Sequence, residues 1–148
     1  MILGEGKNRR ELEELADSLG VRQDLSLPGF EENPFAYMAR SAVFALSSLY
    51  EGLPGVLVQA MACGCPVVST DCPSGPMEIL QNGTHGLLVP VGDDEVMAKA
   101  IQTQLDAPRH QERLRERAAE FSADRAVDEH LEVLFDVYRS SLLNLRKG

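Results

Sequence analysis

Residues 43–68 contain two apolar runs separated by a loop and a short helical segment. The first run, 43–46, ends at two serines, and the second run begins directly after Pro66. Between them, a loop with two glycines and a proline leads into the segment 56–63, which Gly64 follows. Glycine is typical of a helix C-terminus because it adopts positive φ without strain. This order of strand, loop, helix and strand predicts a βαβ unit with parallel strands.

The loop of this unit is the predicted ligand site. In open α/β sheets, ligands bind beyond the carboxyl ends of the strands, where the next helix begins with unpaired N–H groups and the positive end of its dipole. Gly52 and Gly55 would let a ligand approach the backbone closely, because they have no Cβ. The N–H groups of Gly55, Val56 and Leu57 are therefore candidates for binding a phosphate.

Two polar side chains flank this predicted phosphate site. Glu51 precedes the helical segment and Gln59 lies on it, eight positions later. That offset is a little over two helical turns, so both side chains could contact one small ligand.

The rest of the chain continues the alternation of strands and helices. We expect strands at 2–3, 25–27, 43–46, 67–70 and 86–90, and helices at 11–19, 34–40, 56–63, 77–80, 94–105, 109–121 and from 122 onward. The strand at 43–46 reads as buried on both faces, because its apolar run is continuous. The predicted fold class is α/β, with a Rossmann-like parallel sheet flanked by helices.

Composition excludes several functions. The net charge of −9 argues against nucleic-acid binding, which needs a basic face. The chain has no apolar run long enough to cross a membrane and no signal peptide, so we expect a cytoplasmic protein. Three cysteines, Cys63, Cys65 and Cys72, form neither a disulfide framework nor a zinc motif, and we interpret them as reduced core thiols. We expect no metal and no cofactor.

The central motif has a family resemblance. The segments Glu51-Gly52-Leu53-Pro54, Gln59-Ala60-Met61-Ala62-Cys63-Gly64 and Pro66-Val67-Val68 resemble the acidic signature of retaining glycosyltransferases of family 4, group 1. That family has two glutamates separated by seven residues. Here the first is Glu51, and Gln59 stands at the second position. Glutamine lacks the negative charge but still forms hydrogen bonds to a diol.

The resemblance assigns roles to these residues. It implies that Glu51 is the catalytic residue and binds hydroxyls of the donor sugar, and that Gln59 binds the ribose. The donor would also contact Gly52, Leu53, Pro54, Gly55, Val56 and Leu57. Two further loops are included by resemblance, although a tight turn explains each of them as well. They are the glycine loop of Gly4 and Gly6, and Pro28-Gly29-Phe30, which would reach the nucleotide base.

The resemblance covers nearly the whole chain and implies half of a two-domain GT-B enzyme. Residues 1–148 would be its C-terminal, donor-binding domain, without the acceptor domain and the first strand. The whole enzyme would transfer a hexosyl group from a nucleotide diphosphate sugar, first of all a UDP-sugar, to a glycan or lipid-linked acceptor with retention of configuration. It would need no metal and would be cytoplasmic, with association at the membrane.

The same resemblance implies what residues 1–148 would lack when isolated. The family's phosphate-binding arginine and lysine would precede residue 1, so we expect weak nucleotide binding and no sugar transfer. The final helix would pack on the absent domain. We therefore expect a homodimer or an exchanged helix to cover its apolar face. That face is formed by Val127, Leu131, Leu134, Phe135, Tyr138, Leu142 and Leu145.

Two alternatives stay open from the sequence. One is a sugar-nucleotide epimerase of the same architecture, with different catalytic carboxylates. The other is a non-enzymatic α/β interaction module. A phosphoacceptor module would need an aspartate at the end of its third strand, whereas the run at 43–46 ends in Ser47 and Ser48.

Overall fold

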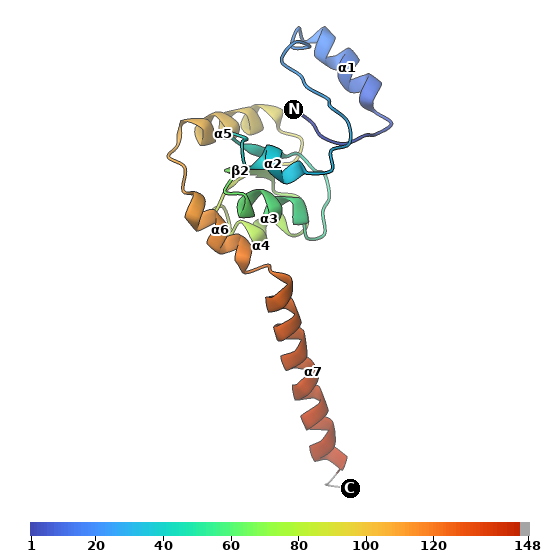
Figure 1. Cartoon of the computed structure of the whole chain (residues 1–148), viewed down its shortest axis with the longest axis vertical. Helices are drawn as coiled ribbons and strands as arrows, with labels where there is room; N and C mark the ends of the chain where they lie inside the picture. The colour runs from blue at the N-terminus through green and yellow to red at the C-terminus, as the bar shows by residue number, and fades with distance from the viewer. Residues whose placement is uncertain (146–148) are drawn as a thin grey trace. The chain divides into compact units, whose positions relative to one another are not determined.

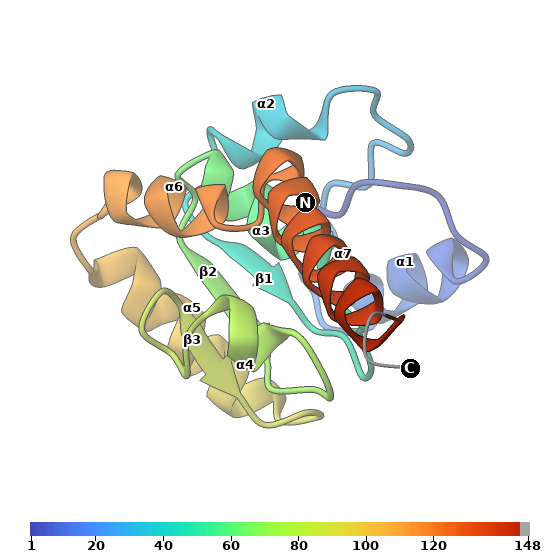
Figure 2. The same cartoon turned by 90° about the horizontal axis from the view of Figure 1, so that it is seen from below.

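The computed structural model describes the backbone of residues 1–145 and the side chains of residues 1–139. The chain forms two compact units, one from Met1 to Tyr37 and the other from Met38 onward. Figures 1 and 2 together label the elements. In chain order these are α1 (Arg9–Ser18), α2 (Pro34–Met38), β1 (Phe44–Leu46), α3 (Gly55–Ala62), β2 (Val67–Thr70), α4 (Pro76–Ile79), β3 (Leu87–Val89), α5 (Asp94–Asp106), α6 (Gln111–Ala119) and α7 (Ala123–Leu145).

The first unit contains α1 and two extended segments beside it. The guanidinium of Arg9 donates to the carbonyl of Leu27, which ties α1 to the second segment. The predicted strands at 2–3 and 25–27 are wrong, because the two segments form only an isolated parallel bridge between Leu3 and Gly29. Pro28 has no N–H to donate to a ladder, and Gly29 has a φ of +94°, which takes the chain out of the extended conformation.

The second unit is built on a parallel three-stranded sheet in the order β1-β2-β3. β2 is central, and all four of its residues are buried. Successive residues on a strand point to opposite faces, and Val67 accordingly joins the core with α3, α4 and α6, whereas Val68 joins the core with α5. The sheet therefore has helices on both faces (Figure 2). The predicted α/β fold class with parallel strands is confirmed.

The prediction that strand 43–46 is buried on both faces is wrong. Phe44 and Leu46 pack against the core beneath α3, but Ala45 is exposed. β1 is the end strand of this sheet, and α5 packs on β2 and β3. An apolar run cannot distinguish an edge strand from a central one, because the difference depends on what pairs with it.

The segment predicted as helix 56–63 forms α3, one residue earlier at each end. Leu57, Ala60 and Met61 are fully buried, since α3 lies between the sheet and α6. Gly64 follows with a φ of +74°, which confirms the predicted helix C-terminus. Both ends of α3 are thus fixed by local sequence.

A buried arginine connects α6 to the end of α4. Arg117 is only 7% exposed, and its guanidinium donates to the carbonyls of Glu78 (2.7 Å) and Ile79 (2.9 Å). The same guanidinium forms an ion pair with Glu120 and lies 4.7 Å from the centre of the Phe121 ring. The last carbonyls of a helix lack intrahelical partners, so Arg117 satisfies the end of this single-turn helix.

The terminal helix forms as predicted, and its apolar stripe is exposed. Val127, Leu131, Leu134, Phe135 and Tyr138 are each between 44% and 64% exposed. Leu142 and Leu145, which are predicted to continue the stripe, lie outside the described side chains. Among the described residues, none of the helices combines the length and apolar character needed to cross a lipid bilayer.

We predict that Arg117→Met destabilises the second unit by about 2 kcal/mol, because the buried carbonyl of Ile79 and the partly buried carbonyl of Glu78 lose a charged donor. Urea denaturation followed by circular dichroism would measure this. Arg115→Met, at an exposed position of the same helix, should change stability by less than about 0.5 kcal/mol. Equal effects of the two substitutions would contradict the role assigned to Arg117.

Candidate functional site

The loop between β1 and α3 lies at the carboxyl end of β1, where the sequence predicts the ligand site. Helix α3 begins at Gly55 after Pro54, and the N–H of Leu57 donates to the carbonyl of Pro54 at 2.9 Å. Within the described chain, the N–H groups of Gly55 and Val56 have no backbone acceptor. Two of the three predicted phosphate-binding amides are therefore available, while the amide of Leu57 is already used.

Glu51 is held in this loop by hydrogen bonds from three directions. Its carboxylate accepts a hydrogen bond from the hydroxyl of Ser48 at 2.6 Å. Its N–H donates to the carbonyl of Pro73 (3.2 Å), and its carbonyl accepts from the N–H of Ser74 (3.0 Å). One carboxylate oxygen is fixed by Ser48, which orients the other oxygen for accepting a hydrogen bond from a ligand hydroxyl.

Ser48 is itself anchored to the central strand. Thr70, the last residue of β2, is 3% exposed, and its hydroxyl donates to the carbonyl of Ser48 at 2.6 Å. The same hydroxyl lies 3.5 Å from the carbonyl of Leu46, so its shorter and stronger hydrogen bond is the one to Ser48. The position of Glu51 thus depends on β2 through Ser48.

The loop after β2 packs directly on the loop of Glu51. Gly75 has a φ of +87°, and a Cβ at this position would lie 2.2 Å from the carbonyl oxygen of Gly52 and 2.6 Å from Cδ of Pro54. A side chain cannot be accommodated there without moving the backbone of the Glu51 loop. Glycine is therefore required at position 75 both for its conformation and for the close approach.

A hollow of about 660 Å³ adjoins the loop after β2. That volume is in the usual range for small-molecule sites. Carboxylate, hydroxyl and amide groups around it could form hydrogen bonds with a sugar. The residues lining it are Asp71, Cys72, Pro73, Ser74, Gly75, Met77, Glu78, Gln81 and Asn82.

The family of the chain follows from a comparison with known families. The family described as glycosyl transferases group 1 matches residues 1–121. The chain belongs to this family. The predicted resemblance to group 1 glycosyltransferases is therefore confirmed.

Two curated relatives of this group 1 chain are named as glycosyltransferases. An N-acetylgalactosaminyltransferase from Campylobacter jejuni, whose full name specifies a diphospho-undecaprenol-linked sugar, is 40% identical over 106 residues. These residues cover 72% of this chain and 29% of that protein. The lipopolysaccharide core biosynthesis glycosyltransferase LpsE of Rhizobium meliloti is 35% identical over 138 residues, which cover 90% of this chain and 40% of LpsE. The chain thus spans less than half the length of either relative.

Solved structures share the fold. A glycosyltransferase from Rickettsia africae superposes with a TM-score of 0.82 at 18% identity, covering 92% of this chain and 39% of that one. A variant of S. aureus TarM, in a complex that contains UDP, gives a TM-score of 0.81 at 22% identity, covering 90% of this chain and 28% of that one. The Rossmann-like fold of the GT-B class is confirmed.

The other residues predicted to bind the donor lie on α3 and in two loops of the first unit. Gln59 is exposed on α3. In the first unit, the structure brings the two predicted loops together, because the N–H of Gly4 donates to the carbonyl of Gly29 at 2.7 Å. Phe30 is largely exposed beside them. The roles predicted for these residues, and for Gly6 and Pro28, stay predictions.

Sequence reasoning missed the residues that support Glu51. From the sequence, Ser48 reads only as the end of a strand, and the loop 73–75 only as a second loop at a strand end. The available signals are a serine three residues before the acid and a glycine before a proline-initiated helix. The serine does not reveal that Thr70 anchors its carbonyl, and the glycine does not reveal its contact with Gly52, because each of these partners is 22 or 23 positions away in the sequence.

We predict that Gly75→Ala destabilises the second unit by at least about 2 kcal/mol more than Gly92→Ala, because overpacking against a backbone carbonyl adds to the cost of positive φ. Gly92 has a φ of +79°, and a Cβ added there would have nothing within 4 Å, so it isolates the conformational cost. Urea denaturation measures the difference. Amide chemical shifts of residues 51–53 should move in Gly75→Ala alone, and unchanged shifts there would refute the packing argument.

Proposed function

We propose that this chain is the C-terminal, nucleotide-sugar-binding domain of a two-domain glycosyltransferase. The family match and the fraction of each relative that the chain spans support this assignment. The whole enzyme would transfer a hexosyl group from a UDP-sugar to a glycan or lipid-linked acceptor with retention of configuration. The family match also favours sugar transfer over epimerisation or a purely structural role.

The observation that carries the proposal is the arrangement of the loop between β1 and α3. A glycosyl transfer from a nucleotide sugar develops negative charge on the departing diphosphate, and fixed N–H dipoles at a helix start stabilise such charge. The amides of Gly55 and Val56 would serve this role. Glu51, oriented by Ser48, would accept hydrogen bonds from hydroxyls of the donor sugar, and Gln59 would contact the ribose.

The remaining nucleotide contacts in the proposal come from the first unit, and the proposed reaction uses no metal. The loops containing Gly4, Gly6 and 28–30 would contact the nucleotide, with the base at Pro28-Gly29-Phe30. No metal and no other cofactor enters the scheme, since amides and protein cations would balance the diphosphate charge. Residues 69–78, which include the rim of the hollow beside Gly75, would influence the choice of sugar.

The proposed acceptor and location follow from what the relatives' names specify. The Campylobacter jejuni relative is named for a sugar linked to a lipid diphosphate, and the Rhizobium meliloti relative for lipopolysaccharide core biosynthesis. We therefore propose a lipid-linked or glycan acceptor, bound with the part of the enzyme that this chain does not include. The whole enzyme would act in the cytoplasm at the membrane surface.

The proposal predicts that the chain binds UDP-sugars and that Glu51 contributes only to the sugar part. A calorimetric screen would compare UDP with UDP-glucose, UDP-galactose and their N-acetylamino forms. Glu51→Gln keeps the side-chain size and should weaken the preferred UDP-sugar about tenfold, or about 1.4 kcal/mol, while UDP binds as before. Absence of binding by every nucleotide, or full UDP-sugar affinity in Glu51→Gln, would contradict the proposal.

The contact between Ser48 and Glu51 gives a second prediction. Ser48→Ala should weaken UDP-sugar binding but not UDP binding, and Ser48→Thr should restore it because threonine keeps the hydroxyl. In the Glu51→Gln background, Ser48→Ala should have little further effect, since Ser48 acts on the sugar only by orienting the carboxylate that Glu51→Gln removes. Additive losses in the double variant would show that Ser48 acts independently of Glu51.

We also propose that the exposed stripe of α7 pairs with a second copy of this chain when the chain is isolated. Exposed apolar area of this kind favours burial by association. Light scattering should therefore detect a dimer at high protein concentration. Leu134→Glu, on the stripe, should yield a monomer, whereas Val133→Glu, on the neighbouring face, should leave the dimer intact. A monomer for the unmodified chain at high concentration would contradict this.

A further inference from the structure

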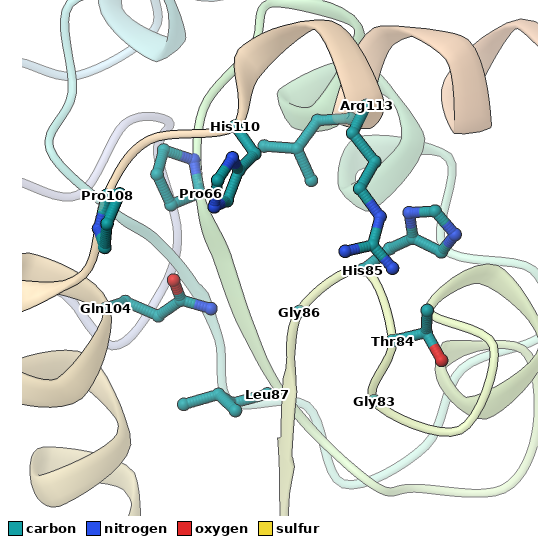
Figure 3. Close-up of a pocket in the computed structure, with 11 residues that line it drawn as sticks. Pro66, Gly83, Thr84, His85, Gly86, Leu87, Gln104, Pro108, His110 and Arg113 are labelled. Carbon is teal, nitrogen blue, oxygen red and sulfur yellow. The ribbon is translucent and has the colours of Figure 1, made fainter.

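A second cavity lies at the amino ends of the strands, whereas Glu51 follows the carboxyl end of a strand. Its volume is about 130 Å³, and it is located where the chain enters β2 and β3, beside the end of α5 and the first turn of α6 (Figure 3). The residues that line it are Pro66, Gly83, Thr84, His85, Gly86, Leu87, Gln104, Pro108, His110, Arg113 and Leu114. The cavity adjoins the amino ends of the strands, so it is separate from the loops at their carboxyl ends.

The lining of this cavity has an unusual charge. The chain contains 23 acidic and 14 basic residues, yet no aspartate or glutamate lines the cavity. Its polar side chains are instead an arginine, two histidines, a threonine hydroxyl and a glutamine amide. All of these can donate hydrogen bonds. In a protein with a net charge of −9, such a lining selects for a negatively charged ligand.

Two donors at this cavity, Arg113 and His110, retain hydrogen-bonding capacity, and a third polar group, Nδ1 of His85, has no partner. Within the part of the chain whose side chains are described, no carboxylate forms an ion pair with Arg113, and His110 makes no side-chain cap to α6. The Nδ1 atom of His85 is buried without a hydrogen-bond partner, while its Nε2 lies 3.0 Å from Oε1 of Gln81. A buried polar atom without a partner is costly, and bound water or an ion commonly satisfies it.

The electrostatics at His85 agree with a positive cavity. Burial lowers the pKa of His85, and the charges of Arg113 and Arg117 lower it further, against a smaller opposing effect of Glu120. Glu120 is already paired with Arg117. The charge of Arg113 is therefore the one left without a counterion near His85, among the residues whose side chains are described.

We propose that this cavity is a binding site for one small oxyanion, with Arg113 as the permanent positive charge and His110 as a hydrogen-bond donor. His85 would add a second donor, Nδ1–H, in its imidazolium form, because in the neutral ring the proton lies on Nε2 beside the acceptor Oε1 of Gln81. The shared chemistry is a phosphate group, either as inorganic phosphate or as the end of a small phosphate ester. The cavity is too small for a nucleotide, whose sites are several times larger. The proposal does not depend on the glycosyltransferase function, because neither Glu51 nor α3 contributes to it.

Arg113 and Arg115 provide a matched pair for the test. Both are exposed residues of α6 and carry the same charge, but only Arg113 lines the cavity. Inorganic phosphate would be titrated at constant ionic strength, with chloride as the balancing salt, and binding followed by amide shifts of residues 83–87. We expect saturable binding that Arg113→Gln weakens at least tenfold and Arg115→Gln leaves within about twofold.

A second measurement follows the ring of His85 by proton chemical shifts. Because a bound anion stabilises the imidazolium, phosphate should raise the pKa of His85 relative to chloride, and Arg113→Gln should remove this difference. Arg117 and Glu120, the other charged groups acting on this ring, are unchanged in that variant. If Arg113→Gln changed the pKa of His85 only through the structure, the change would be the same in phosphate and in chloride.

Two further experiments identify the form of phosphate that binds and the site at which it binds. Glycerol 3-phosphate binding as well as inorganic phosphate would indicate an ester as the ligand, and inorganic phosphate alone would indicate the free ion. Both support the proposal. Non-saturable shifts, equal losses in Arg113→Gln and Arg115→Gln, or displacement of phosphate by UDP would overturn it. In the last case phosphate would bind at the loop of Glu51.

Discussion

The predicted donor site depends on the contact between the loops that follow β1 and β2. Both loops emerge at the same edge of the sheet because the strands are parallel. Two backbone hydrogen bonds join Glu51 to residues 73 and 74, and Gly75 lies too close to Gly52 for any side chain. The backbone of Glu51 is thus held by residues 73 and 74 and its carboxylate by Ser48, with β2 as the rigid base.

Burial explains why β2 can serve as that base. Its four residues are buried, with one helical layer on each face, so the strand end at Thr70 has little freedom to move. Arg117 extends the same rigidity to α4, whose amino end follows Gly75 directly. Groups that must be positioned for a ligand are therefore supported by elements with their own packing, which lowers the entropy lost on binding.

Much of this organisation could be predicted from the sequence, and the failures have a common cause. The helices, β2, β3 and the ends of α3 depend on apolar periodicity and on capping residues that lie close in sequence. The predicted strands at 2–3 and 25–27 are wrong because Pro28 and the turn at Gly29 interrupt a ladder between distant segments. The exposure of Ala45 escapes prediction because it depends on which strand forms the edge.

The sequence by itself determined the family, the α/β class and the loop that contains Glu51, since these are encoded in residues within about twenty positions of each other. Only the tertiary structure decided that the hydroxyl of Ser48 orients Glu51 while Thr70, 22 positions away, anchors the carbonyl of Ser48. It likewise decided that position 75 must be a glycine. It also decided that Arg113 and two histidines share one cavity. Such contacts join separate loops, and their partners are selected by the packing of the sheet and not by local sequence.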